Sequence, residues 1–282
     1  MRVPTAREFF FSPPPLDDHA REQRHRAFFH ALRLRNGTNK TTYARRLDSV
    51  NAVVNRALPA HRPLDIMDVG VSSGISTMEW MDDLDGAGVE YQMTAGDVCV
   101  NAYLLAPADW LHILVDRDGY PLQFDICGRA LPYPPGLRRS LLLPPLPLLM
   151  HACRWVLPRV AATRLKDKGT PVRLVDPQLQ ARAAAIVEDD LLAPHAFERG
   201  FDVVRAANVL NRCYFSDEML RVMTTNLRRR LKRHGILVVC RTDEHDINHG
   251  TVFVSNGSPR LEVLCRIGAG SELERLVLDT TP

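Results

Sequence analysis

The sequence lacks several features that would assign it at once to a broad class of protein. Its six cysteines lie far apart, with no C-x-x-C pair and no Cys/His ligand spacing, so neither a structural zinc site nor a disulfide framework is indicated. The 36 Lys and Arg residues nearly balance the 33 Asp and Glu residues, and the net charge of +3 does not require a nucleic-acid partner. No apolar run is long enough for a transmembrane helix or a signal-peptide core. We therefore expect a reduced, cytoplasmic, globular protein without a bound metal.

The length of 282 residues allows one large core with an appended subdomain. Residues 1–60 contain two amphipathic helical patterns and are interpreted as an N-terminal helical cap. Residues 61–282 are interpreted as the main domain, with an insertion at about 107–180 that is rich in leucine and proline. Within it, 130–165 is predicted to be a lid-like excursion, and peripheral membrane contact through 137–160 is the alternative.

Strand-like and helix-like segments alternate through the main domain. A short apolar run ends at Gly70 and passes into a helical pattern, and a capped amphipathic helix is predicted over 216–235. The segments 251–268 and 272–278 are read as closing strands. The pattern predicts an α/β fold with a doubly wound, seven-stranded, mostly parallel sheet and an antiparallel last strand.

The most informative segment is the turn DVGVSSG over 68–74, where the first strand meets a helix. Such a turn presents backbone N–H groups and a helix N-terminus to a ligand. A dinucleotide fingerprint would need glycines at the positions that Ser72 and Ile75 occupy, so nicotinamide or flavin binding is disfavoured.

The same turn satisfies G-x-S-x-G, the nucleophile elbow of α/β-hydrolases. Ser72 would be the nucleophile, and Asp243, His245 and His249 follow in the right order for its partners. The strand before a nucleophile elbow normally comes after several others, however, and no convincing strand precedes the one that ends at Gly70. No oxyanion segment lies upstream either. A hydrolase is therefore kept as an alternative.

The turn also resembles the first motif of class I S-adenosylmethionine-dependent methyltransferases, acidic-x-Gly-x-x-x-Gly at the end of strand one. Asp68, Gly70 and Gly74 match this motif. The resemblance implies that the glycines let the chain pass close to the cofactor, and that Asp68 organises the turn or contacts the cofactor's ammonium group. Ser72 and Ser73, within the turn, are also predicted to contact the cofactor.

Further acids lie at the ends of the next two predicted strands of this family pattern. Asp97 matches the residue that accepts hydrogen bonds from the ribose hydroxyls. Asp189 or Asp190 matches the residue that takes the adenine amino group, and Asp190 is preferred because Leu191 follows it. Leu191 is also predicted to contact the cofactor. The resemblance covers about 64–240 and implies S-adenosylmethionine as the cofactor. The simpler interpretation is that each acid caps the following helix.

A looser similarity links the chain to the chemotaxis-receptor glutamate methyltransferases. The segment RAANVLNRCYF over 205–215 is similar to their R-N-V-x-x-Y-F segment, and TTYAR over 41–45 to their N-terminal cofactor contact. This similarity implies that Arg45, Ala207 and Asn208 contact the cofactor. The spacing of the R and N residues and the long insertion both depart from that subfamily.

The resemblance implies in-line O- or N-methyl transfer to a small molecule or peptide that is partly apolar. His245, after the fifth strand, is predicted to be a general base, and Asn208 and Tyr214, after the fourth, are further catalytic candidates. The 107–180 insertion and the N-terminal helices are expected to select the acceptor. Besides the hydrolase, a non-catalytic cofactor-binding or scaffold protein is kept as an alternative to the methyltransferase.

Overall fold

The computed structural model describes residues 2–13, 17–35, 37, 40, 42–59, 63–132, 150, 152–153, 156, 169–194, 197, 199–258 and 260–281. The chain forms two compact units, each built from two stretches of sequence. Met1–Thr42 and Cys99–Leu174 make the antiparallel unit, and Tyr43–Val98 and Val175–Pro282 make the parallel-sheet unit. These boundaries differ from the predicted division at residue 60 and from the predicted insertion at 107–180.

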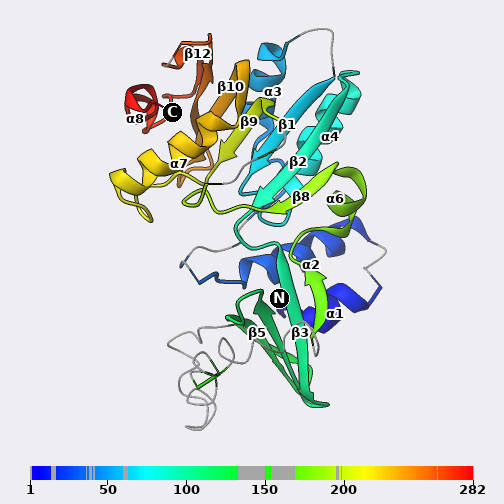
Figure 1. Cartoon of the computed structure of the whole chain (residues 1–282). Coiled ribbons are helices and arrows are strands. Elements are labelled where there is room, and N and C mark those ends of the chain that lie inside the picture. Colours follow the sequence, from blue (N-terminus) through cyan, green and yellow to red (C-terminus); the bar gives the residue numbers. More distant parts are fainter. Residues whose placement is uncertain are drawn as a thin grey trace. The chain divides into compact units, whose positions relative to one another are not determined.

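The parallel-sheet unit contains a seven-stranded sheet in the order β12-β11-β10-β9-β1-β2-β8 (Figure 1). The strands are β1 (Leu64–Val69), β2 (Tyr91–Asp97), β8 (Ala185–Glu188), β9 (Phe201–Ala207), β10 (Leu231–Thr242), β11 (Asn248–Val254) and β12 (Glu262–Ile267). The five neighbouring strands β8, β2, β1, β9 and β10 are parallel. β11 runs antiparallel to β10, and β12 runs antiparallel to β11. The predicted α/β fold with a seven-stranded, mostly parallel sheet and antiparallel pairing at its end is confirmed. The strand that runs against the others is β11, not the last strand, β12.

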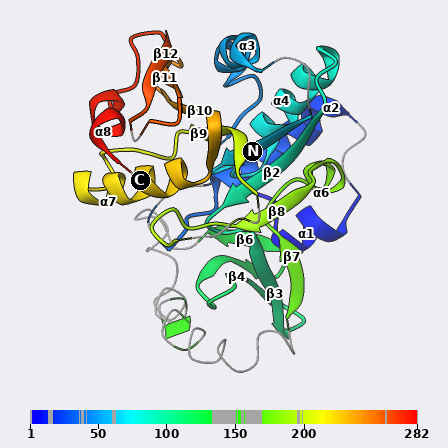
Figure 2. The ribbon, with the colours of Figure 1, turned by 45° about the horizontal axis from the view of Figure 1, so that its top comes forward.

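Helices cover both faces of this sheet (Figures 1 and 2). Side chains of α3 (Asp48–Ala57), α4 (Ile75–Gly86) and α6 (Pro177–Arg182) join one apolar cluster with the strands. Those of α7 (Asp217–Arg229) and α8 (Glu274–Asp279) join another. Because α3 buries its apolar face here, it belongs to this unit and not with the helices that precede it.

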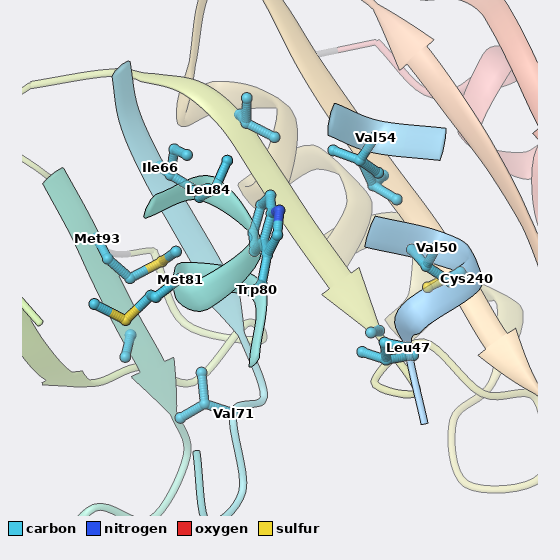
Figure 3. Close-up of a cluster of buried hydrophobic side chains, with 14 of the residues drawn as sticks. Leu47, Val50, Val54, Ile66, Val71, Trp80, Met81, Leu84, Met93 and Cys240 are labelled. Carbon is cyan, nitrogen blue, oxygen red and sulfur yellow. The ribbon is translucent and has the colours of Figure 1, made fainter. Parts of the chain in front are cut away.

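Trp80 of α4 lies at the centre of the first cluster and is fully buried. Figure 3 shows its ring between Ile66 and Leu84 on one side and Leu47 and Val50 on the other. The indole N–H donates to Asn55 Oδ1 at 2.9 Å, so the polar edge of the ring is satisfied. Trp80 thereby ties α3 and α4 to the strands beneath them.

Two predictions near the C-terminus are wrong: where one helix ends, and whether a later segment is a strand or a helix. The helix that begins after Ser216, whose side chain accepts from Met219 N–H, ends at Arg229 and not at Gly235. The chain then enters β10, where Lys232 pairs with acids of other strands. The segment 272–278, predicted as a strand, contains α8, because its buried apolar residues recur at helical spacing.

The antiparallel unit contains a five-stranded sheet in the order β6-β5-β4-β3-β7. Its strands are β3 (Asn101–Ala108), β4 (Leu111–Asp116), β5 (Pro121–Ile126), β6 (Arg129–Pro132) and β7 (Thr170–Arg173). The hairpin between β4 and β5 turns at Asp118-Gly119, a dipeptide that favours tight hairpin turns. The helices α1 (Ala6–Phe11) and α2 (Asp18–His30) share a core with these strands, so the N-terminal segment belongs to this unit.

The hypotheses of a lid over 130–165 and of membrane contact through 137–160 rest mainly on 133–149. That stretch lies outside the described residues. Within the part of the chain that is described, no helix combines the length and apolar character needed to cross a membrane.

An aromatic cluster joins α1 to α2 in the antiparallel unit. Phe9 stacks on Phe28 with ring centroids 4.2 Å apart, and the His25 ring lies 4.6 Å from that of Phe29. Burial lowers the pKa of His25 from 6.5 to about 4. His25 is therefore neutral in the folded protein at neutral pH.

This burial predicts a loss of stability in mild acid. Between pH 6.5 and 4 the unfolded chain binds a proton at His25 and the folded chain does not, so the free energy of unfolding falls by about 3 kcal/mol. Denaturant titrations at several pH values should show this slope, and His25→Phe should reduce it. An equal slope in the variant would contradict the prediction.

Candidate functional site

The carboxyl ends of the five parallel strands lie on one edge of the sheet. Strand order reverses between β1 and β9, because the chain continues from β1 to β2 on one side and returns to β9 on the other. In open α/β sheets a ligand crevice forms at this switch point. The turn after β1 and the loop after β9, which begins at Asn208, flank it.

The turn after β1 is held tightly by the neighbouring strand. The N–H groups of Gly70 and Val71 both donate to Gly96 O, at 2.7 and 3.1 Å. Gly70 and Gly74 have φ of +72° and +93°, values that favour glycine. A Cβ at Gly70 would lie 2.2 Å from Val209 Cγ2, and one at Gly74 would lie 2.4 Å from a side-chain carbon of Leu179. Both glycines are thus required by the protein's own packing, whereas the resemblance assigns them to the cofactor.

Asp97 closes β2 and faces this turn. Its Oδ2 accepts a hydrogen bond from Ser72 N–H at 2.8 Å, and the residue is 5% exposed. Ser73, in the same turn, is fully buried, and its hydroxyl has no hydrogen-bond partner in the structure. The acid predicted to bind ribose and the turn predicted to approach the cofactor are therefore in direct contact.

Asp68 points into the core instead of toward this edge. Arg205, its register partner on β9, donates to both carboxylate oxygens at 2.9 and 2.6 Å. Thr77 Oγ1 donates a third hydrogen bond at 2.7 Å. These contacts fit the predicted role of Asp68 in organising the turn, and they engage both oxygens.

The two acids after β8 have opposite environments. Asp189 is buried and accepts from both terminal nitrogens of Arg230, at 2.5 and 2.8 Å. Asp190 is exposed, and its carboxylate accepts from Leu192 N–H in the following turn. Leu191 is buried in the core. Of the two candidates for the adenine contact, only Asp190 presents its carboxylate at the surface.

The loop after β9 is joined to the end of β10. Ala207 closes β9, and Asn208 adopts φ of +60°. The Asn208 side chain accepts from Thr242 N–H at 2.8 Å and donates to Thr242 Oγ1 at 3.3 Å. Asn248 receives a hydrogen bond from Thr242 Oγ1 and donates to Arg46 O, at 2.8 Å each. Sequence patterns did not identify Thr242 or Asn248.

The segment before α3 is anchored at this same edge. Arg45 N–H donates to Glu79 Oε1 of α4 at 2.6 Å, and burial raises the pKa of Glu79 above its usual value. The Arg45 side chain is 85% exposed and pairs with Asp48. Tyr43 donates a hydrogen bond to Asp246 in the turn between β10 and β11. Arg45 thus lies in this unit with its guanidinium toward solvent, and its contact with the cofactor stays a prediction.

The three catalytic candidates are not brought together. The side chain of His245 is 74% exposed, and Tyr214 is 55% exposed. The side-chain hydrogen bonds of Asn208 reach Thr242 and neither of the others.

His249 is held by two hydrogen bonds on opposite sides of its ring. Nδ1 accepts from Ala269 N–H at 3.0 Å, so Nε2 carries the proton and donates to Asp243 Oδ2 at 3.2 Å. Hydrogen bonds from Ile247 and His245 N–H groups and from His249 lower the pKa of Asp243. No hydrogen bond of His245 or His249 reaches Ser72, so the pairing that a hydrolase triad needs is not formed in the structure.

Backbone strain concentrates at this edge. Six non-glycine residues in the described ranges have positive φ, and four of them surround the switch point. These four are Arg45, Ser72, Asn208 and Asp246. Such conformations are costly and gather at functional sites. Among the described residues, no three His, Cys, Asp or Glu side chains gather in a way that could hold a metal ion.

Comparisons with known proteins give weak similarities. No family model and no curated protein sequence matches the chain. Three solved structures that resemble it are the CMeT domain of the citrinin polyketide synthase, the N-methyltransferase NodS from Bradyrhizobium japonicum WM9 with S-adenosyl-L-homocysteine, and the CcbJ methyltransferase from Streptomyces caelestis. The identities are 15%, 12% and 15%, and the TM-scores are 0.31, 0.33 and 0.33.

The matches cover 69%, 72% and 83% of this chain, and 33%, 65% and 78% of the three structures. This chain therefore spans a third of the first structure and just under two thirds of the second. At such TM-scores these structural similarities carry no weight of their own.

Proposed function

We propose that this protein is an S-adenosylmethionine-dependent methyltransferase. The observation that carries the proposal is the contact between two sequence motifs at the switch point. The Gly70–Gly74 turn donates from Ser72 N–H to the carboxylate of Asp97 at 2.8 Å. Both motifs match the family that the sequence resembles, and they meet where an α/β sheet binds ligands.

The residues at this edge fit the proposed cofactor. A carboxylate at the end of β2 suits the hydroxyls of a ribose, because charged acceptors form strong hydrogen bonds. The buried, unpartnered hydroxyl of Ser73 offers a polar group in the turn. Asp97 would hold the ribose, Asp190 would meet the adenine amino group, and the turn would lie against the remainder of the cofactor. When bound, the cofactor supplies a methyl group already activated by its sulfonium.

The chain's contribution to the reaction is then mainly positional. The Asn208–Thr242 contacts fix the loop after β9, and the segment from Tyr43 to Arg46 is anchored across the same edge. A preformed edge of this kind aligns an acceptor with the methyl group and excludes water. We propose O- or N-methyl transfer to a small molecule or peptide. His245 and Tyr214, whose side chains are exposed, remain the candidates for proton transfer.

Binding of S-adenosylhomocysteine tests this function directly. At a ligand concentration one hundred times Kd, mass action should stabilise the protein by about 2.7 kcal/mol and raise Tm. NADH is the control ligand, and a fluorophosphonate probe reports a reactive Ser72. Binding of NADH alone, or labelling of Ser72, would overturn the proposal in favour of a dinucleotide enzyme or a hydrolase. If the protein binds neither S-adenosylhomocysteine nor NADH and the probe does not label Ser72, a scaffold protein would be favoured.

The Asp97→Ala variant should weaken cofactor binding by about 1.5–3 kcal/mol, the range for hydrogen bonds to a charged group. Asp97→Asn keeps an acceptor for Ser72 N–H and removes the charge, so it separates loss of turn geometry from loss of the ribose contact. Calorimetry with S-adenosylhomocysteine measures both variants. Parent-like affinity in Asp97→Ala would refute the assignment of this residue.

A further inference from the structure

Arg205 is a charged residue within the most completely buried strand of the sheet. Every position of β9 is buried, and the Arg205 side chain is 1% exposed. Its guanidinium lies 4.2 Å from the centre of the Trp80 ring. Desolvating a guanidinium is costly unless its hydrogen bonds are satisfied, so the contacts that satisfy it deserve a functional explanation.

The guanidinium links its own strand, β9, to three other elements. It donates twice to Asp68 of β1, and Nη1 donates to Asn51 Oδ1 of α3 at 2.6 Å. Nη2 also donates to Ser76 O, in the first turn of α4, at 3.2 Å. Thr77, the next residue of that turn, donates to the same Asp68 carboxylate.

These contacts surround the proposed cofactor turn. Asp68 precedes Gly70 by two residues, and Ser76 follows Gly74 by two, so Arg205 holds both ends of the turn. Arg205 also lies on β9 three residues before Asn208, where the loop on the other side of the switch point begins. We propose that Arg205 is a positioning residue that sets the conformation of the turn for cofactor binding. This inference rests on the proposed function.

The fork geometry of arginine is essential to this role. Lysine keeps the positive charge but presents a single nitrogen, which cannot bridge both Asp68 oxygens, Asn51 and Ser76 O together. In Arg205→Lys the turn should spend only part of its time in the binding conformation. Apparent affinity falls in proportion to that fraction, so a turn formed one tenth of the time weakens binding about tenfold.

The chain offers a matched control at the opposite end of the same two strands. Lys232 of β10 pairs with Asp65, near the start of β1, and with Asp202, near the start of β9. Lys232→Met therefore removes a charged link between the same strands without touching the carboxyl edge. General destabilisation of the sheet should affect both variants, whereas loosening of the turn should occur only in Arg205→Lys.

The experiment compares the two variants with the parent by two measurements. Amide hydrogen exchange without ligand reports the turn itself: amides 70–77 should exchange at least fivefold faster in Arg205→Lys, and within twofold of the parent in Lys232→Met. Calorimetry with S-adenosylhomocysteine should give a Kd raised about tenfold in Arg205→Lys and within twofold in Lys232→Met.

Equal effects of the two variants on exchange or on Kd would overturn the positioning role. If Arg205→Lys does not fold, Thr77→Val replaces it, because this variant removes only one hydrogen bond to Asp68, and the same selective loosening is required of it. Absence of S-adenosylhomocysteine binding by the parent would refute the proposed function, while the exchange measurement would still decide whether Arg205 orders the turn.

Discussion

Gly70→Ala should reduce the free energy of unfolding by about 4 kcal/mol, the sum of a left-handed backbone at a non-glycine residue and a steric overlap with the half-buried Val209 side chain. The added Cβ would lie 2.2 Å from Val209 Cγ2, and φ at this position is +72°. Denaturant titration measures the change. The effect is expected without any ligand, because the obstructing atom belongs to the protein.

Val209→Ala provides the decisive companion. The same Cβ would lie 3.5 Å from Val209 Cβ, an ordinary contact, so removing Cγ2 relieves the overlap and leaves the backbone strain. In the Val209→Ala background, Gly70→Ala should cost about 2 kcal/mol less. Additive effects of the two substitutions would show that Val209 does not confine the turn.

Asp189→Ala should destabilise the parallel-sheet unit by about 3–5 kcal/mol, because it leaves a buried guanidinium without its carboxylate. The side chains of Asp189 and Arg230 are 0% and 2% exposed, and the pair is bidentate. Replacing both by apolar residues, Asp189→Leu with Arg230→Met, should restore much of the loss. Chemical denaturation measures all three variants.

Asp190→Ala is the matched control, one residue along the chain. Asp190 is exposed and its carboxylate accepts one hydrogen bond from Leu192 N–H, so its loss should cost less than about 1 kcal/mol. The expected binding effects are reversed, since Asp190 is the proposed adenine contact. Similar stability losses in the two alanine variants would contradict the assignment of Asp189 to the core.

The sequence predicted the parallel sheet well because its signals are local. Apolar runs that end at glycine or an acid marked β1, β2 and β8, and alternation with helices gave the layered fold. The antiparallel unit was not predicted, because nothing local in residues 1–42 indicates that they share a core with 99–174. The C-terminal helix α8 was missed because its apolar run, Leu276 to Leu278, is too short to distinguish a helix from a strand.

The sequence indicated which acids close strands, but not what those acids contact. Only the register of β1 with β9 shows that Asp68 opposes Arg205. A charged residue within the apolar strand FDVVRAA was a usable sign that a buried partner exists. The pairing of Asp189 with Arg230 carried no such sign, because Arg230 lies in a run of basic residues typical of a helix end.

The interleaving of the two units constrains how the chain folds during synthesis. The antiparallel unit is complete in sequence once Leu174 has emerged, whereas β1 and β2, made earlier, still lack β8 and β9 as neighbours. Strands with unpaired edges are prone to pair wrongly. The unpaired edges of β1 and β2 therefore stay exposed to wrong pairing until residues 185–207 have been made, after the whole sequence of the antiparallel unit.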